Sequence, residues 1–226
     1  MNSLLNLINW DGILSLLIAC IEFLLLVNLL VFAEKNKVNK IIFLIIILLA
    51  VYQSVEFIIC NLGMDSSFTA YLAFAVISFL PPLNFLFILH ISRSGSKINY
   101  FLFIPALLFT VYYLIVIEQF SVVQCTVLYA TYNYPLGDLY GFFYYLPVLL
   151  SFLFLMKKKK KINSKQFSIL LIAHLFIMIP VIAGFSLLYL NLPGLVKSME
   201  SILCKFAFGY AVALSIFCIR NKSEIK

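Results

Sequence analysis

The sequence predicts an all-α membrane protein, a bundle of seven transmembrane helices with its N-terminus outside and its C-terminus in the cytoplasm. Of its 226 residues, 64% are hydrophobic and 11% are charged, whereas soluble domains are about half apolar and about a quarter charged. The apolar residues form uninterrupted stretches long enough to cross a hydrocarbon layer of about 30 Å. They lack the alternation typical of membrane barrel strands, so helices are predicted.

Seven stretches have the length that a helical span requires. Residues 1–5 lack the basic region of a cleavable signal peptide, so we expect the first span to remain in the protein. The chain is therefore predicted to form one domain from spans at residues 13–32, 41–60, 68–91, 100–117, 139–156, 167–190 and 195–219.

The charges of the connecting segments predict the orientation of the bundle. Fourteen of the sixteen Lys and Arg residues lie at residues 34–40, 92–97, 157–165 and 220–226. The opposite segments carry Asp11, Asp65, Glu118 and Asp138 and almost no cations. By the positive-inside rule, the basic segments face the cytoplasm, which indicates a multi-pass protein of the cytoplasmic (inner) membrane.

The net charge of +7 is therefore a signal of topology. An anionic lipid bilayer is a sufficient partner for the lysine run 157–161. That run is short, lies between two spans and has no interleaved aromatic residues, so no nucleic-acid partner is expected.

Ionisable side chains within a span cost several kcal/mol unless they are partnered. Counting 1.5 Å per residue places Glu22 and Lys205 at the same depth, and the first and seventh spans are neighbours in a closed bundle. We therefore predict a buried Glu22–Lys205 ion pair, with Glu56 as the competing partner. This pair either fixes the helix register or takes part in ligand binding or proton transfer. The predicted intramembrane polar centre consists of Glu22, Gln53, Glu56, His174 and Lys205.

His174 has no second ligand at metal-binding spacing on its own helix, so no metal site is predicted. Of the five cysteines, Cys60 and Cys125 lie on the outer side. Two alternatives are open for them: free thiols, or a disulfide that pins the long outer loop. That loop, about residues 119–138, and the segment after it are rich in tyrosine, which is typical of an interfacial belt or of a ligand-binding lip.

Catalytic motifs are absent: the sequence has no GxSxG, HExxH, Walker or CxxC pattern. We expect neither an enzyme nor a cofactor. The run Lys205-Phe206-Ala207-Phe208-Gly209 resembles the retinal-attachment segment of microbial rhodopsins. In that family an Asp precedes the lysine by four residues, whereas this chain has Ser201, and its only Trp is Trp10. A retinal photoreceptor is therefore the least favoured alternative.

Several different short motifs follow one another along the predicted spans. They are Glu56; Phe79-Leu80-Pro81-Pro82 with Leu86-Phe87; Phe103-Ile104-Pro105-Ala106-Leu107; Tyr140-Gly141-Phe142 with Tyr144-Tyr145; Gln166; Ile179-Pro180; and Ile219-Arg220. Together with the span layout, they resemble the N-terminal seven-transmembrane sensor module of bacterial and archaeal histidine kinases and diguanylate cyclases. The resemblance implies a module that receives a signal from outside the cytoplasm or from the membrane.

Two functions of different classes remain open. The first is a sensory or interaction module that binds a small apolar ligand or lipid in its outer half. Because the sequence ends at Lys226, shortly after the last span, we expect such a module to act without its own output domain, through a separate membrane or cytoplasmic signalling protein. The second is a small transporter or channel, although seven spans and eight glycines do not divide into two repeats.

Overall fold

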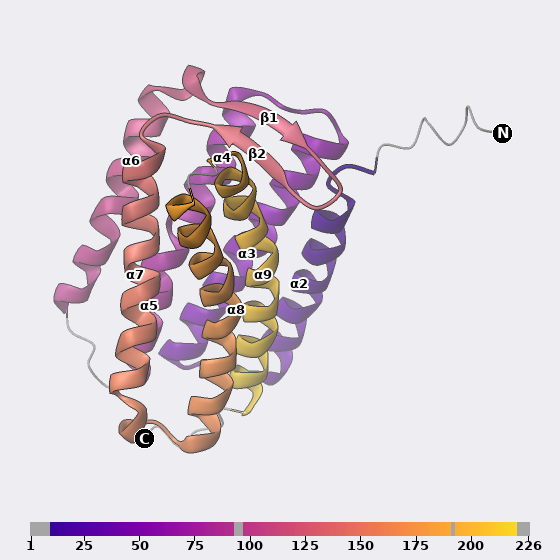
Figure 1. Ribbon diagram of the computed structural model, residues 1–226. Coiled ribbons are helices and arrows are strands. Elements are labelled where there is room, and N and C mark those ends of the chain that lie inside the picture. The colour runs from indigo at the N-terminus through magenta and orange to yellow at the C-terminus, as the bar shows by residue number, and fades with distance from the viewer. Residues whose placement is uncertain (1–9, 93–96, 191–192, 221–226) are drawn as a thin grey trace.

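The computed structural model describes residues 10–92, 97–190 and 193–220, and for residues 97–99, 161, 193–197 and 200 it describes the backbone alone. The chain start, the loop at 93–96 and the basic tail after Arg220, on which parts of the orientation argument depend, lie outside the described residues. The described chain forms a helical bundle with a small β-hairpin across one end (Figure 1).

The bundle consists of long apolar helices joined by short turns. The α-helices are α2 (Ile13–Phe32), α3 (Lys37–Asn61), α4 (Ser67–Ser78), α5 (Leu80–Ile91), α6 (Ile104–Ile115), α7 (Gly137–Lys157), α8 (Ser164–Tyr189) and α9 (Pro193–Arg220). Three 3₁₀ segments, Lys97–Phe103, Ile117–Gln119 and Lys159–Lys161, lie beside them. The strands are β1 (Ser121–Cys125) and β2 (Ala130–Asn133).

Six helical segments of the described chain are long and apolar enough to cross a membrane, and a shorter apolar one covers Tyr100–Ile115. One of the six, Ser67–Ile91, consists of α4 and α5 and is interrupted at Phe79. Pro81 and Pro82 follow this break, because proline removes a backbone donor and its ring clashes with the preceding turn. The prediction of an all-α, multi-pass membrane bundle is thereby confirmed.

The predicted span at residues 100–117 is replaced by a composite element. The chain enters it through the 3₁₀ segment Lys97–Phe103 and continues as α6, which has 12 residues. Pro105, at the start of α6, fits there because the first turn of a helix needs no internal donor. The other predicted spans agree with helices to within a few residues, and the span at 13–32 coincides with α2.

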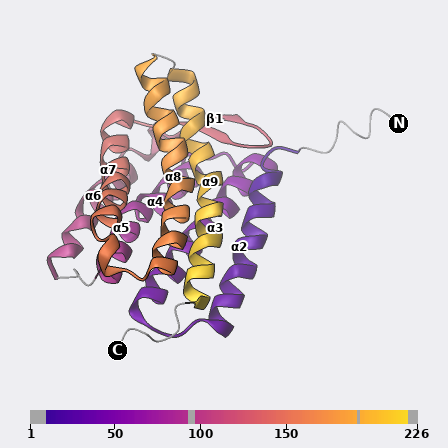
Figure 2. The same ribbon diagram turned by 60° about the horizontal axis from the view of Figure 1, so that its bottom comes forward.

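Helix α3 runs through the middle of the bundle and contacts α2, α4, α5 and α9. Its apolar side chains Ile42, Ile45, Ile46 and Leu49 are almost completely buried, and Leu214 of α9 is fully buried with them. Figures 1 and 2 show α9 between α8 and α2. The first and last helices are therefore neighbours, as predicted for a closed bundle.

The β-hairpin was not predicted from the sequence. β1 and β2 pair antiparallel, with Cys125 opposite Ala130 and an irregularity between Val122 and Gln124. The hairpin lies across the end of the bundle at which α2 begins and α3 ends, because the Gly12 N–H donates to the carbonyl of Thr126 (3.0 Å).

Aromatic side chains hold the hairpin on the helices. The ring of Phe74 in α4 lies 5.3–6.2 Å from the rings of Tyr113, Phe120, Tyr132 and Tyr140, centroid to centroid. These are the distances of favourable edge-to-face pairs. Tyr132 and Tyr140 are buried, so these two tyrosines of the outer segment pack inside the protein and do not form an interfacial belt, which was one of the two alternatives for this segment.

Candidate functional site

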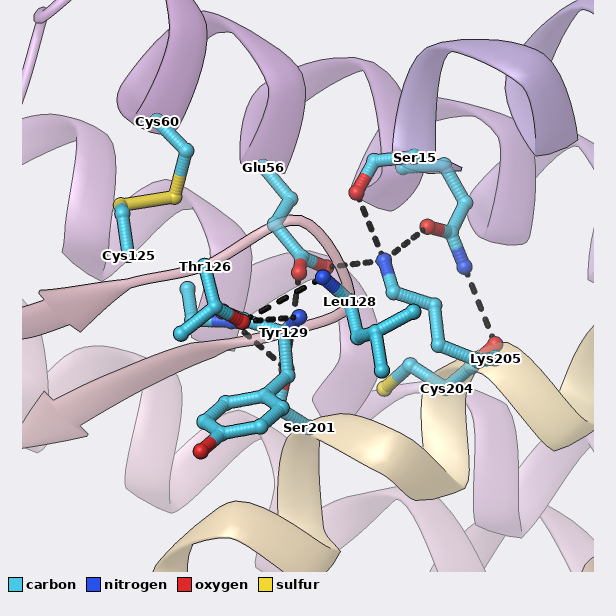
Figure 3. Close-up of polar contacts among 12 residues, drawn as sticks. Ser15, Glu56, Cys60, Cys125, Thr126, Leu128, Tyr129, Ser201, Cys204 and Lys205 are labelled. Atoms are coloured by element: carbon cyan, nitrogen blue, oxygen red, sulfur yellow. Dashed lines mark hydrogen bonds and ion pairs between the residues drawn. A yellow bond between two sulfur atoms is a disulfide. The ribbon is translucent and has the colours of Figure 1, made fainter. Parts of the chain in front are cut away.

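A buried ion pair lies beneath the hairpin and joins three helices. The Lys205 ammonium in α9 donates to the Glu56 carboxylate in α3 (2.9 Å), to Gln53 Oε1 (2.7 Å) and to Ser15 Oγ in α2 (2.7 Å) (Figure 3). The side chains of Lys205 and Glu56 are 9% and 1% exposed. All three ammonium hydrogens thus have acceptors, which is the condition under which a buried lysine stays charged.

The same cluster extends to the backbone of α9 and to the hairpin. Gln53 Nε2 donates to the Cys204 carbonyl (3.0 Å), which fixes the amide oxygen toward Lys205. The Ser201 hydroxyl donates to the second oxygen of Glu56 (3.5 Å) and accepts from the Ala130 N–H of β2 (3.2 Å). A continuous path of polar contacts therefore runs from β2 through Ser201 and Glu56 to Lys205.

The predicted Glu22–Lys205 pair is wrong, because Lys205 pairs with Glu56. Side chains lean toward the N-terminus of their own helix, and the N-terminal end of α9 is the hairpin end. Lys205 therefore extends toward Ser15 in the first turn of α2. Glu22 follows seven residues later, about 10 Å further from the hairpin. Counting depth along the helix axes neglected this lean.

The other predicted polar residues, Gln53, Glu22 and His174, lie in three different places. Gln53 belongs to the Lys205 cluster, whereas Glu22 is fully buried and its carboxylate oxygens have no hydrogen-bond partner among the described residues. The His174 Nδ1 lies 2.9 Å from the carbonyl of Leu170 in its own helix, and its ring packs edge-on against Tyr210. Within the described part of the chain, no group of three or more His, Cys, Asp or Glu residues is arranged to hold a metal ion.

A second polar contact, which sequence reasoning missed, links three helices deeper in the bundle. Asn84 of α5 donates to Ser151 of α7 (2.9 Å) and accepts a hydrogen bond from the Tyr210 hydroxyl of α9. The available signal was an asparagine two residues after Pro82 within an apolar span, since polar side chains in spans pair across helices.

A disulfide ties the hairpin to the bundle. Cys60, at the end of α3, is bonded to Cys125, the last residue of β1, which decides between the two alternatives left open by the sequence. The adjoining turn is closed by Thr126, whose hydroxyl donates to the Tyr129 carbonyl (2.8 Å). The pKa of Tyr132, which lies in β2, is raised well above its usual value. The main cause is burial of its side chain, and the nearby Glu56 carboxylate adds to it.

A groove of about 510 Å³ lies between α7 and α8, and Met199 of α9 also lines it. These two helices are joined at the lysine-rich turn, at the end of the bundle away from the hairpin (Figure 1). The walls are apolar and contain small residues, and one carboxylate lies at the outer rim: they include Gly137, Asp138, Gly141, Tyr145, Pro180 and Gly184. By contrast, the two cavities that Cys204 lines beside the ion pair hold only about 40 Å³ each.

Fold and site together define a multi-pass α-helical membrane protein with a buried ion pair beneath a β-hairpin. No protein-family model matches the chain, and neither the curated proteins nor the solved structures contain a match. The resemblance to sensor modules stays a prediction.

Proposed function

We propose that the protein is a seven-helix sensory or interaction module of the cytoplasmic membrane. In this proposal it binds a lipid-type ligand in the groove between α7 and α8 and signals to a separate membrane or cytoplasmic protein. The observation that carries the proposal is the groove itself, since its volume of about 510 Å³ lies within the roughly 300–1,000 Å³ of ligand sites. Its apolar walls with a single rim carboxylate also have the composition of such sites.

The proposed orientation places the hairpin outside and the lysine-rich turn in the cytoplasm. Disulfides persist in oxidising compartments, and Cys60–Cys125 lies at the hairpin end. Lys157, the last residue of α7, and the lysines that follow it lie at the opposite end. The seventh span would consist of the 3₁₀ segment Lys97–Phe103 and α6, which together extend about 32 Å and so match the hydrocarbon thickness.

The groove suits an amphiphile with one acyl chain and a headgroup that is cationic or donates hydrogen bonds. Its walls continue into side chains exposed on the outside of α7 and α8, among them Phe142, Phe185 and Leu188, so a lipid has a lateral path from the bilayer. Asp138 is exposed at the outer rim, where its charge complements a positive headgroup. We therefore propose a lipid as the occupant.

A route from the groove to the ion pair supports a signalling role. Gly141 and Tyr145 line both the groove and the small aromatic cavity beneath the hairpin. That cavity is also lined by Ser201, which contacts Glu56. A ligand that moves Tyr145 thus changes the cavity that is also lined by Ser201, a hydrogen-bond partner of Glu56.

Native mass spectrometry of the purified protein tests the binding proposal. The wild type is expected to retain a lipid, and Gly184→Trp is expected to lose it. A Cβ atom at Gly184 meets no atom within 4 Å, so the indole enters the groove and does not distort the helix. Ile172→Trp is the matched control, because Ile172 lies exposed on the same helix outside the groove. Equal lipid retention by all three proteins would refute the proposed site.

A small transporter is the second candidate, and the buried Glu56–Lys205 pair favours it because ionisable residues in spans mark ion paths. Against it, the half of the bundle away from the hairpin is filled by buried apolar side chains such as Ile42, Phe87 and Phe217. Proteoliposomes containing a pH-sensitive dye should show no proton flux above that of protein-free liposomes. Flux that Glu56→Gln abolishes would favour transport.

A further inference from the structure

Glu22 is a buried carboxylate that the ion pair leaves without a partner. It lies in the middle of α2 and is fully buried, and neither of its oxygens has a hydrogen-bond partner among the described residues. Its neighbours Phe23 and Leu24 are 51% and 63% exposed, so α2 borders the bilayer next to it. Glu22 therefore lies in a lipid-surrounded bundle without a visible counter-charge.

The ionisable groups around Glu22 come from the two helices that pack against α2, which are α3 and α9. The charge of Lys205 acts on Glu22 across the helix interface, but the Lys205 ammonium is saturated by Ser15, Gln53 and Glu56. Among the side chains that the structure describes, the buried ionisable groups of α3 and α9 are Tyr52, Glu56, Cys204, Lys205, Tyr210 and Cys218. Lys205 therefore contacts Glu56 and not Glu22, although its charge acts on both carboxyl groups.

An isolated ionised carboxylate in an apolar medium is so costly that the group takes up a proton instead. We propose that Glu22 is a proton-binding site within the membrane, whose carboxyl group is neutral while Lys205 pairs with Glu56. When Lys205 leaves Glu56 and turns toward Glu22, the Glu22 proton passes to Glu56. In either arrangement one carboxyl group carries the proton and the other pairs with the Lys205 ammonium, so the net charge of the bundle is unchanged.

This inference does not depend on the lipid-binding proposal, because it concerns α2, α3 and α9 and not the groove. In the proposal the molecule has two states: Lys205 pairs with Glu56 in one and with Glu22 in the other, and the two carboxyl groups lie at different depths in the bundle. Glu56 is linked to the hairpin through Ser201 and Ala130, whereas Glu22 lies about 10 Å deeper than Ser15. An event at the hairpin can therefore change which carboxyl group holds the proton.

Dicyclohexylcarbodiimide, an apolar reagent that enters membranes, tests the protonation of Glu22 directly. The acid proton moves to a nitrogen of the carbodiimide, and the carboxylate oxygen bonds to its central carbon. The acyl group then migrates from oxygen to nitrogen, and the resulting N-acylurea retains every atom of both reactants. Peptide mass spectrometry of the full-length protein labelled at pH 7 is expected to find this adduct on Glu22 and not on Glu56.

Variants distinguish a proton site from a merely buried residue. Glu56→Gln leaves Lys205 free to pair with Glu22, so labelling of Glu22 is expected to fall several-fold. Lys205→Met removes the cation, so labelling of Glu22 is expected to persist. Unmodified Glu22 in the wild type, or labelling that Glu56→Gln does not reduce, would overturn the proposal.

A second measurement needs no change in the ion pair. The infrared spectrum of the wild type should contain the carbonyl band of a protonated carboxylic acid, and this band should be missing in Glu22→Gln. Identical spectra in that region would likewise refute protonation of Glu22. Gln is close in shape to a protonated Glu, so this variant is expected to fold.

Discussion

At the scale of single residues, the two carboxyl groups of the bundle have opposite environments. Glu56 faces an ammonium at 2.9 Å and a serine hydroxyl, whereas Glu22 has no hydrogen-bond partner in the part of the chain that is described. A substitution that removes charge but keeps shape should therefore have different effects at the two positions. Comparing the two Glu→Gln variants therefore distinguishes a charged carboxylate in an ion pair, at Glu56, from a neutral carboxylic acid, at Glu22.

Glu56→Gln is expected to lower the free energy of unfolding by about 3–5 kcal/mol, because it leaves Lys205 as a buried cation without its counter-charge. Glu22→Gln, the matched control, is expected to change it by less than about 1 kcal/mol, within the range of neutral hydrogen bonds. Thermal denaturation in detergent measures both variants. Equal destabilisation by the two substitutions would contradict the assignment of Lys205 to Glu56.

The double variant Glu56→Gln/Lys205→Met should be more stable than Glu56→Gln alone, because it removes the uncompensated charge. Residues that contact each other show such non-additive effects, typically of about 0.5–3 kcal/mol. A double-mutant cycle by thermal denaturation measures the coupling. Additive losses would mean that the pair is not formed.

At the scale of elements, the hairpin depends on a bond that closes a long stretch of chain. Cys60 and Cys125 are 65 residues apart, so the disulfide holds β1 onto the end of α3. Removing it with Cys125→Ser should lower the free energy of unfolding by about 2–4 kcal/mol and increase amide exchange in β1 and β2. Cys20→Ser is the control, because Cys20 is an exposed free thiol. A reductant should destabilise the wild type and Cys20→Ser, and leave Cys125→Ser unchanged.

The pairing of α8 with α9 depends on close approach at one glycine. A Cβ atom at Gly209 would lie 2.6 Å from a ring carbon of Phe176, whereas one at Gly184 would meet no atom within 4 Å. Gly209→Ala is therefore expected to destabilise the protein by about 1–3 kcal/mol through overpacking. Gly184→Ala should be neutral or slightly stabilising, because alanine is the better helix former. Thermal denaturation of the two variants measures these changes in stability. Equal changes for Gly209→Ala and Gly184→Ala would argue against close packing of Gly209 on Phe176.

Hydropathy and charge were sufficient to predict the helices, because a span in lipid must satisfy its backbone internally and so appears as a continuous apolar run. The hairpin was missed because the loop was interpreted by its tyrosines. Its β-branched residues Val122, Val123, Thr126 and Val127 were the available strand signal. The sequence predicted which charged residues are buried, but it favoured Glu22 over the competing partner Glu56 for Lys205, because the choice depends on the direction of the lysine side chain.

At the scale of the whole molecule, the Lys205 cluster and many aromatic contacts lie at the hairpin end, whereas the half of the bundle away from the hairpin is filled mainly by apolar side chains. The proposed orientation predicts the accessibility of each end. In a cysteine-free background, a membrane-impermeant maleimide applied to intact cells should label Leu128→Cys at the hairpin turn and not Lys159→Cys. Both positions are exposed, so each should react after the cells are broken. Labelling of Lys159→Cys in intact cells would reverse the orientation.

The central claim is that the groove between α7 and α8 binds a lipid, and photo-crosslinking in native membranes tests it most directly. A fatty acid with a diazirine group, incorporated into cellular lipids, is expected to crosslink mainly within residues 137–149 and 180–188. Gly184→Trp should lose these crosslinks, and Ile172→Trp should keep them. Crosslinks spread evenly over all lipid-facing helices, and unchanged in Gly184→Trp, would contradict the claim.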